Sequence, residues 1–429
     1  MKGVDQTFDL TVIGSGVTGL AAALFAAQSG IRTLLMGGSG QSDFSSGLID
    51  LMGVHPVSQG TRWENPWAAI EALRRNDPRH PYALLDAGLI RRALTTFLSF
   101  TAETGLPYRW KQGQNTPVPT AMGTIKHTFG VPAGMWAGTT VTQSREPLLI
   151  VDFEGLKGFT ARQIASLLGT IRPGVRSLRV PNPLGASVRE LLPGHLAAGF
   201  ESPDARARLA DLIKPRLDGA ARVGLPAVIG LHRHEEAMME LTDRIGAAVF
   251  EIPGTWPSIP ALRFQRALTG RLAEMDVVLM RSNRVFGARA DGADGFVLHT
   301  GNGAARTRIL TRGVILATGR FLGGGLSSDR SGIRESVFDL PLFMPEDREG
   351  WHRRSFLDAR GHPLNRAGII VDEAMQPLNK RQQPVYPGLF AAGTILAHQD
   401  WKREKCGTGL SIATAFQAVR SFRLWGRLP

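Results

Sequence analysis

A glycine-rich turn between an apolar strand and a helix of small residues is the feature that most constrains how this chain can fold. We expect the strand over 8–13, the helix over 20–29 and a second buried strand over 32–36. The turn has G-x-G-x-x-G spacing, which allows a tight bend, close approach of a phosphate to the backbone, and packing of helix on strand. The spacing predicts a nucleotide-binding βαβ unit. Its turn residues are Gly14, Ser15, Gly16 and Gly19.

The unit lacks the acidic residue that commonly contacts an adenosine ribose. In such units an Asp or Glu follows the first glycines by about 20 residues. Here that position is Gly37-Gly38, and no Asp or Glu occurs from Leu10 to Ser42. Two interpretations stay open. Either the bound nucleotide has no adenosine half, or backbone amides and water hold its ribose without a carboxylate.

Length and composition are those of a globular protein with more than one domain. The 429 residues are enough for two domains of roughly 100–200 residues each. Hydrophobic residues make up 43% and charged residues 20%, which excludes a disordered chain or a coiled coil. No run approaches about 20 uninterrupted apolar residues, so we expect neither a signal peptide nor a membrane-spanning helix.

The chain is basic, with 50 Lys and Arg against 37 Asp and Glu and a formal charge of +13. This charge favours anionic partners such as phosphorylated substrates, acidic subunits or anionic lipid. The basic residues are dispersed, and no RNA-recognition or zinc-finger spacing occurs. We therefore expect no nucleic acid partner.

Cys406 is the only cysteine. The chain has no intramolecular disulfide, and it cannot ligate an iron–sulfur cluster, which needs about four thiolates. Any cluster chemistry must belong to a partner. A redox role for the thiol is possible beside Lys405 and a helix start, but a single cysteine without a resolving partner favours a packing role.

Motif placement predicts that an insertion interrupts the nucleotide-binding domain. A Gly/Pro-rich middle from 106 to about 260 has its own strand at 147–153 and helices near 160–168 and 204–217. We therefore predict an α/β fold, with a Rossmann-like domain, which the segments described next assign as a flavin-binding domain, and an inserted α+β cap domain. The predicted boundaries are 1–75 and 255–429 for the discontinuous flavin-binding domain and 76–254 for the cap.

The flavin assignment depends on two further segments. Short strands, expected at 277–280, 284–289, 295–300 and 307–310, lead into "GVILATG" at 313–319, as in many flavoproteins. The segment from Pro387 to Val419 predicts a strand, a glycine turn, a polar loop and then Gly-Thr-Gly at the start of an apolar helix. The N–H groups and positive dipole of such a helix start favour the electron-rich edge of a reduced flavin.

With these segments, the chain resembles the flavoprotein superfamily of fumarate reductase and glycerol-3-phosphate dehydrogenases. More narrowly, it resembles the B subunit of the anaerobic glycerol-3-phosphate dehydrogenase over nearly its whole length. The narrower resemblance rests on "FSSGLIDLMG" (44–53), "LLIVDFEGLKGF" (148–159), "VFEIPGTWPSIPALRFQRAL" (249–268) and the C-terminal "KCGTGLSIATA".

The resemblance implies oxidation of sn-glycerol 3-phosphate to dihydroxyacetone phosphate, with electrons passed via an iron–sulfur partner to quinone. It implies a companion FAD-containing catalytic subunit and an iron–sulfur membrane-anchor subunit. Through them the chain is expected to be cytoplasmic and peripheral to the inner face of the cell membrane. Whether this chain oxidises the substrate or only relays electrons stays open, as does the assembly stoichiometry.

The resemblance also gives candidate cofactor-binding residues. Hydroxyls and amides at 45–47 are expected to bond the ribityl chain, and Thr394 replaces an acid that is common in the superfamily. Together with the missing acid at 37–38, this favours FMN, with FAD as the alternative. The candidates after the first turn are Ser45, Ser46, Gly47, Ala317, Thr318, Gly319, Gly393, Thr394, Gly407, Thr408 and Gly409.

The sequence does not identify a catalytic residue. Oxidation of an alcohol carbon needs a base for the hydroxyl proton and cations for the phosphate. His398 and Asp400 lie in the loop before the last helix, and His232 and Arg263 lie in the middle domain, so these four are weak candidates. A His-x-His pattern without a third ligand is poor evidence for a metal, and no metal is assigned.

Three other functions remain open. The chain fits a stand-alone fumarate-reductase-like flavin oxidoreductase that acts on a carboxylate. It also fits a flavin-free scaffold subunit that uses a degenerate nucleotide fold to hold partners. A basic RNA-modifying flavoprotein is the third, and it would bind RNA with a steep salt dependence.

Overall fold

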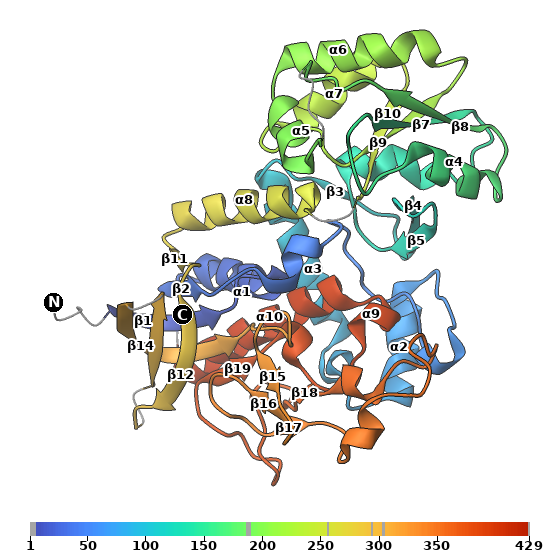
Figure 1. The fold of residues 1–429 in the computed structure, drawn as a ribbon. Coiled ribbons are helices and arrows are strands. Elements are labelled where there is room, and N and C mark those ends of the chain that lie inside the picture. The colour runs from blue at the N-terminus through green and yellow to red at the C-terminus, as the bar shows by residue number, and fades with distance from the viewer. Residues whose placement is uncertain (1–5, 186–189, 255–256, 293–294, 303–304, 428–429) are drawn as a thin grey trace. The chain divides into compact units, whose positions relative to one another are not determined.

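The structure is a computed structural model and describes residues 6–185, 190–254, 257–292, 295–302 and 305–427 (Figure 1). Contacts divide the chain into two compact units. Unit 1 comprises Met1–Ser42, Asp50–Leu98 and Leu268–Pro429, and unit 2 comprises Asp43–Ile49 and Ser99–Ala267. The sequence-based domain boundaries at 75 and 254 stay a prediction.

A mixed seven-stranded sheet forms the centre of unit 1. Its strands are β1 (Gln6–Ile13), β2 (Thr33–Met36), β11 (Val278–Met280), β12 (Arg284–Ala290), β13 (Phe296–Asn302), β14 (Ala305–Leu316) and β19 (Leu389–Ala391). The strand order is β11-β2-β1-β14-β13-β12, with β19 also paired to β14. The pairs β11–β2, β2–β1, β1–β14 and β14–β19 are parallel, whereas β14–β13 and β13–β12 are antiparallel. β12, β13 and β14 form the predicted antiparallel meander, whereas the strand expected at 277–280, β11, lies at the other edge of the sheet and pairs in parallel with β2.

β14 is one continuous strand where sequence analysis predicts two. It pairs with β13 along one edge and with β1 along the other, and Val314–Leu316 also pair with β19. Gly313 suggests a break in the sequence pattern, but it lies inside the strand. A Cβ there would lie 2.3 Å from a ring carbon of Phe422, so the glycine marks a close approach of an aromatic ring to the strand.

Two helices of small residues cover this sheet. α1 (Val17–Gln28) and α10 (Gly407–Gly426) pack on one another and contact strands of the sheet. The ring of Phe25 meets that of Phe416 edge to face at 4.9 Å between centroids. Ala and Gly on α1, together with Ser and Thr on α10, let the two backbones approach closely. The neighbouring helices are α2 (Pro66–Asn76), α3 (Ala87–Glu103) and α9 (Trp401–Glu404).

Short two-stranded antiparallel pairs complete both units. In unit 1 they are β15 (Leu326–Ser328) with β16 (Ile333–Glu335) and β17 (Leu342–Phe343) with β18 (Gly368–Ile369). In unit 2 they are β3 (Tyr108–Arg109) with β6 (Val131–Pro132) and β4 (Thr116–Pro119) with β5 (Ile125–Thr128).

Unit 2 contains an entirely parallel four-stranded sheet of order β10-β9-β7-β8. The strands are β7 (Leu148–Phe153), β8 (Val175–Val180), β9 (Arg222–Pro226) and β10 (Ala248–Ile252). Every residue of β7 is buried, as expected for a central parallel strand covered on both faces. The helices of unit 2 are α4 (Ala161–Gly169), α5 (Pro193–Gly199), α6 (Pro203–Ile213) and α7 (His234–Ile245). The helix α8 (Ile259–Glu274) begins in unit 2 and continues into unit 1 at Leu268. The predicted α/β class of the chain is confirmed. The insertion was predicted as α+β, whereas the main sheet of unit 2 is entirely parallel.

Among the residues that the structure describes, no helix combines the length and apolar character that crossing a membrane requires.

Gly313→Ala is expected to destabilise unit 1, because the added methyl group overlaps the buried ring of Phe422. Overpacking of this kind costs about 1–3 kcal/mol. At about 2–4 °C per kcal/mol, Tm should fall by several degrees. Gly287→Ala in β12 is the matched control, because nothing lies within 4 Å of a Cβ at that position. Equal Tm values for the two variants would contradict the close-approach explanation.

Candidate functional site

The glycine-rich turn at the end of β1 is shaped by backbone approaches that only glycine allows. Gly14 has φ +113°, and a Cβ there would lie 2.3 Å from the carbonyl oxygen of Ala317. A Cβ at Gly19 would lie 1.7 Å from the carbonyl oxygen of Gly14. Gly16, the N-cap of α1, has more room, since its nearest neighbour would be Ser39 O at 3.4 Å. The turn therefore has the local geometry that the motif predicts.

The end of β2 carries no carboxylate and is tied to the same turn. The Ser15 amide donates to Gly38 O at 3.0 Å, and the Ser15 hydroxyl donates to Gly37 O. The Gly14 amide donates to Met36 O at 2.7 Å. Gly37 has φ +93°, which favours glycine at that position for backbone reasons. Gly37 thus has a conformational role where related units place an acid.

Two further predicted segments meet this turn in unit 1. The Ala317 amide donates to Ile13 O at 2.9 Å, and the next residue, Thr318, has a buried hydroxyl with no hydrogen-bond partner. Gly393 has φ +78°, and a Cβ there would lie 2.1 Å from the hydroxyl of Thr18 on α1. The structure therefore brings 14–19, 317–319 and 393–394 together.

Small residues also shape the start of α10. A Cβ at Gly407 would lie 2.8 Å from the Trp401 ring, and one at Gly409 would lie 2.8 Å from the hydroxyl oxygen of Tyr82. The Gly409 amide donates to Asp50 O at 2.7 Å, so one N–H of the predicted flavin-facing set is engaged within the protein. Thr408 lies between these two glycines, in the first turn.

The residues of unit 1 fit a phosphate-bearing flavin. The first turns of α1 and α10 contain no acidic side chain, so their positive dipole ends favour anionic groups. The cradle at Gly16 admits a close ligand, and the Thr318 hydroxyl is a buried polar group that still needs a partner. Gly14 to Gly19 would hold a phosphate, and Thr318 would contact another part of the ligand.

Ser45, Ser46 and Gly47 belong to unit 2. The hydroxyl oxygens of Ser45 and Ser46 accept from the amides of Gly47 and Leu48, which is a local turn interaction. Gly47 has φ +77°, and its carbonyl accepts from the Tyr108 hydroxyl at 2.7 Å. The role of these residues toward a ribityl chain stays a prediction.

One buried arginine holds the loop that follows β19. Arg320 comes directly after the Ala-Thr-Gly motif and is 8% exposed. Burial lowers the pKa of Arg320 to about 10, so the guanidinium keeps its charge at neutral pH. Its nitrogens donate to four backbone carbonyls, those of Asn365, Thr394, Leu396 and Gln399.

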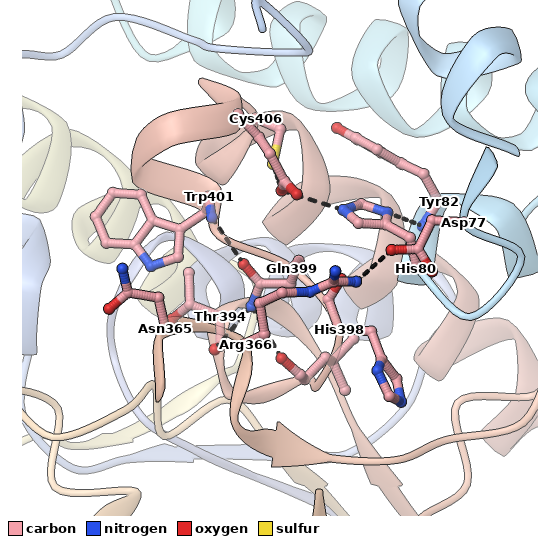
Figure 2. A network of polar contacts seen from close by, with 12 residues as sticks. Asp77, His80, Tyr82, Asn365, Arg366, Thr394, His398, Gln399, Trp401 and Cys406 are labelled. Carbon is pink, nitrogen blue, oxygen red and sulfur yellow. Dashed lines mark hydrogen bonds and ion pairs between the residues drawn. The ribbon is translucent and has the colours of Figure 1, made fainter. Parts of the chain in front are cut away.

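Side chains within the loop complete this network (Figure 2). Gln399 donates to Thr394 O and Leu396 O and accepts from the Trp401 amide at 3.0 Å. Arg366 bridges the carboxylate of Asp77 and the backbone carbonyl of His398. The loop is thus fixed mainly through its carbonyl oxygens.

His80, Glu404 and Cys406 form a buried cluster at the start of α10. The Nε2 atom of His80 lies 3.2 Å from the carboxylate of Glu404, and the thiol of Cys406 lies 3.4 Å from the same oxygen. The three ligand atoms lie within 4.8 Å of one another. At this spacing all three atoms could bind one metal ion.

The hydrogen bond at the second ring nitrogen of His80 favours direct hydrogen bonds among the three side chains over binding of a metal ion. The Tyr82 amide donates to His80 Nδ1 at 3.1 Å, so the neutral ring carries its proton on Nε2 and donates to Glu404. A metal at Nε2 would need that proton to move to Nδ1, where it would face an N–H donor. Metal-bound histidines instead donate from their second nitrogen to an oxygen.

Cys406 is a buried thiol. Burial raises its pKa well above the ordinary value, and the nearby Glu404 carboxylate raises it further. The thiolate is therefore disfavoured, although the thiol stands at the N-cap of α10 beside Lys405. The packing interpretation from the sequence agrees with this environment, and a redox role does not.

The loop candidates for catalysis differ in how their polar groups are used. Burial, together with the charges of Arg79 and Arg366, lowers the pKa of His398 to about 4. Asp400 accepts from Asn365 and pairs with Arg403, so its carboxylate has internal partners.

Arg263 and His232 are the two catalytic candidates in unit 2, and the contacts observed for both are with other residues of the protein. Arg263 makes a two-pronged ion pair with Glu251, at 2.6 and 2.8 Å, and is 4% exposed. It lines a cavity of about 480 Å³ that lies wholly within unit 2. His232 is exposed in the turn before α7 and contacts Arg266. The proposed catalytic roles of both residues stay predictions.

Sequence reasoning missed Arg320 and Arg366. Neither stands in a recognised motif. Arg320 contacts Gln399, which is 79 residues away. Arg366 contacts His398 and Asp77, which are 32 and 289 residues away. The available signal was the place of Arg320 immediately after Gly319. A cation next to a ligand-binding turn is a reasonable candidate for a positioning residue.

Glu404→Gln is expected to lower the free energy of unfolding by about 1.5–3 kcal/mol at pH 7, the usual contribution of a hydrogen bond to a charged group. Burial raises the pKa of Glu404, but interactions with His80 outweigh it and leave that pKa below its ordinary value. Ionised Glu404 therefore stabilises the fold above its unfolded pKa, and this contribution is lost as pH falls through the folded pKa.

In urea unfolding, the difference between Glu404→Gln and the wild type should be present at neutral pH and shrink as pH falls below about pH 4, where the carboxylate takes up its proton. Exposed Glu64→Gln is the control and should match the wild type. A difference that does not shrink between about pH 4 and about pH 2 would overturn the assignment.

Gly19→Ala is expected to disrupt the turn, because its methyl group would overlap Gly14 O. Purified variant protein should retain much less flavin absorbance per chain than the wild type. Gly270→Ala, at an exposed position of α8 with nothing within 4 Å, is the matched control and should keep its flavin. Full flavin retention in Gly19→Ala would remove this turn from the site.

Comparison with known proteins identifies the family. The FAD binding domain family model matches residues 9–410. This match supports a flavin cofactor and names FAD; it does not support the preference for FMN that the missing acid suggested. A solved structure of the open conformation of a flavocytochrome c3 fumarate reductase is similar at 10% identity and TM-score 0.45, covering 99% of this chain and 79% of that one.

Curated relatives match along nearly the whole chain. A protein of Halobacterium salinarum, named as the probable B subunit of an anaerobic glycerol-3-phosphate dehydrogenase, is 32% identical, with 96% of each chain covered. The B subunit of the anaerobic glycerol-3-phosphate dehydrogenase of Vibrio vulnificus is 28% identical, with 96% of this chain and 95% of that one covered. The chain therefore belongs to the FAD-binding domain family and, within it, to the B-subunit family of the anaerobic glycerol-3-phosphate dehydrogenases.

Proposed function

We propose that the chain is the flavin-carrying B subunit of a complex that oxidises sn-glycerol 3-phosphate to dihydroxyacetone phosphate. The observation that carries the proposal is the match to B-subunit relatives over 96% of the chain, together with a complete glycine cradle in unit 1. A formal charge of +13 is compatible with a phosphorylated substrate.

The proposed cofactor is FAD, held without a ribose carboxylate. A bound flavin supplies the two-electron chemistry of alcohol oxidation. The chain contributes the α1 start and the Gly14–Gly19 turn for phosphate, and the buried Thr318 hydroxyl for a polar contact. Backbone groups at Gly37 and Gly38 replace the usual acid, so ribose binding would depend on amides and water.

The rest of the electron path belongs to partner subunits in this proposal. A single cysteine supports the placement of iron–sulfur chemistry on another chain, which in turn passes electrons to quinone. The same partners would hold this chain at the inner face of the cell membrane. A companion FAD-containing subunit completes the complex, with substrate oxidation on one of the two flavoprotein chains.

The proposal is tested by anaerobic dye reduction with the complex purified together with its partner chains. We expect sn-glycerol 3-phosphate to reduce the dye and glycerol to leave it oxidised. The chain alone, in liposomes containing quinone, should give no sustained quinone reduction. Activity of the complex with succinate but not glycerol 3-phosphate would instead support the fumarate-reductase-like alternative.

Release of the cofactor by heat, followed by chromatography, is expected to yield FAD from chain purified without added flavin. The reason is the match of residues 9–410 to the FAD binding domain family, because the glycine cradle alone would bind the phosphate of either flavin. The control is a known FAD protein carried through the same release. Stoichiometric FMN without FAD would contradict the cofactor proposal.

A further inference from the structure

A cavity of about 310 Å³ lies within unit 1, apart from the glycine cradle residues. Its walls come from the 3₁₀ turn η3 (Pro81–Leu84), from residues 369–371 at and after β18, and from the loop that carries His398. The walls are mostly apolar. Their apolar side chains include Pro81, Leu84, Phe343, Ile369 and Val371.

His398 lines this cavity and carries a polar atom without a partner. The residue is 5% exposed and lines the cavity, and its Nδ1 atom is buried without a hydrogen-bond partner. Its ring centroid lies 4.2 Å from that of Phe343, so the ring is held against an aromatic wall. Figure 2 shows the His398 ring directed away from the other labelled side chains of the network. A buried polar atom of this kind needs a partner.

The backbone of His398 is fixed, so the ring cannot easily turn elsewhere. Its amide donates to Arg366 O at 2.9 Å, and its carbonyl accepts from the Arg366 side chain at 2.8 Å. Its φ of +64° is in the left-handed region, which ordinary side chains rarely adopt. The surrounding structure therefore holds an uncommon backbone conformation at the residue whose ring lines the cavity.

The charge at the cavity is positive. Arg79 lines it, and among the described lining residues none is Asp or Glu. Asp77, two residues before Arg79, is paired with Arg366. The guanidinium of Arg79 and an N–H of the His398 ring are both donors suited to an oxyanion, and both residues line the cavity.

We propose that this cavity binds a small organic anion, with its carboxylate or phosphate on Arg79 and His398 and its carbon body on the apolar walls. The apolar walls favour a ring or short hydrocarbon over a bare inorganic ion or a polyol. The cavity is assigned to no step of the proposed dehydrogenase reaction, and binding is measurable without turnover. Failure of this inference is therefore separable from failure of the proposed function.

Isothermal titration calorimetry of the purified holoprotein tests the proposal with four probes. Benzoate and phenyl phosphate carry both an anionic group and an apolar ring. Benzyl alcohol lacks the charge, and inorganic phosphate lacks the ring. Benzoate and phenyl phosphate should bind, and the other two should bind at least about tenfold more weakly, the factor expected for losing about 1.4 kcal/mol. Benzyl alcohol binding as tightly as benzoate, or phosphate as tightly as phenyl phosphate, would overturn the proposal.

Three variants localise the binding. Arg79→Gln removes the charge at an exposed position and should weaken benzoate about tenfold, consistent with loss of a charge-assisted hydrogen bond. His398→Asn keeps a residue that tolerates positive φ and should also weaken benzoate. Arg75→Gln, on the exposed last turn of α2 and outside the cavity lining, is the matched control and should bind like the wild type.

Leu84→Trp fills the cavity from η3 without changing charge and should abolish binding of both ring probes. Circular dichroism of each variant establishes that it is folded. Benzoate binding that survives both Arg79→Gln and Leu84→Trp in folded protein would place the ligand elsewhere and overturn the proposal. Absence of benzoate and phenyl phosphate binding to wild-type protein at millimolar concentration would also overturn it.

Discussion

The close contact of three backbone segments at the end of β1 is the constraint on which the rest of unit 1 depends. Gly14 approaches Ala317 on one side, and Gly19 approaches Gly14 from the first turn of α1, at separations that no side chain permits. These contacts bring α1 directly over the strand end and place its N-terminus beside the Ala-Thr-Gly segment. Gly393 extends the same close packing to Thr18 of α1. The nucleotide cradle therefore results from backbone packing.

A second level of organisation depends on charge. Arg320 donates to four carbonyl oxygens of two segments, and Arg366 adds a fifth contact of the same kind at His398. A loop with these contacts does not need regular secondary structure, because its buried carbonyl groups are satisfied by guanidinium groups. The same interactions hold the backbone of His398, whose ring lines its cavity. The arginine contacts thus fix the loop backbone at the residue whose imidazole lacks a hydrogen-bond partner.

The sequence predicts the parts of the fold that depend on local pattern. The glycine motif, the two apolar strands beside it and the α10 start each follow from short stretches. The continuity of β14 through Gly313 is not predicted, because the reason for that glycine is Phe422, more than 100 residues later. The His80–Glu404 contact, across 324 positions, is likewise invisible to local pattern. The preference for FMN failed for a related reason, since a missing carboxylate does not show what amides and water can bind.

The buried carboxylate of Glu404 couples two distant parts of unit 1. It lies shortly before α10, where it accepts from His80 and Cys406. The contact with His80 joins the segment before the last helix to a residue 324 positions earlier. Loosening of either segment would leave a buried carboxylate without its partner, which is costly. The two segments are therefore expected to open together, as one cooperative part of the fold.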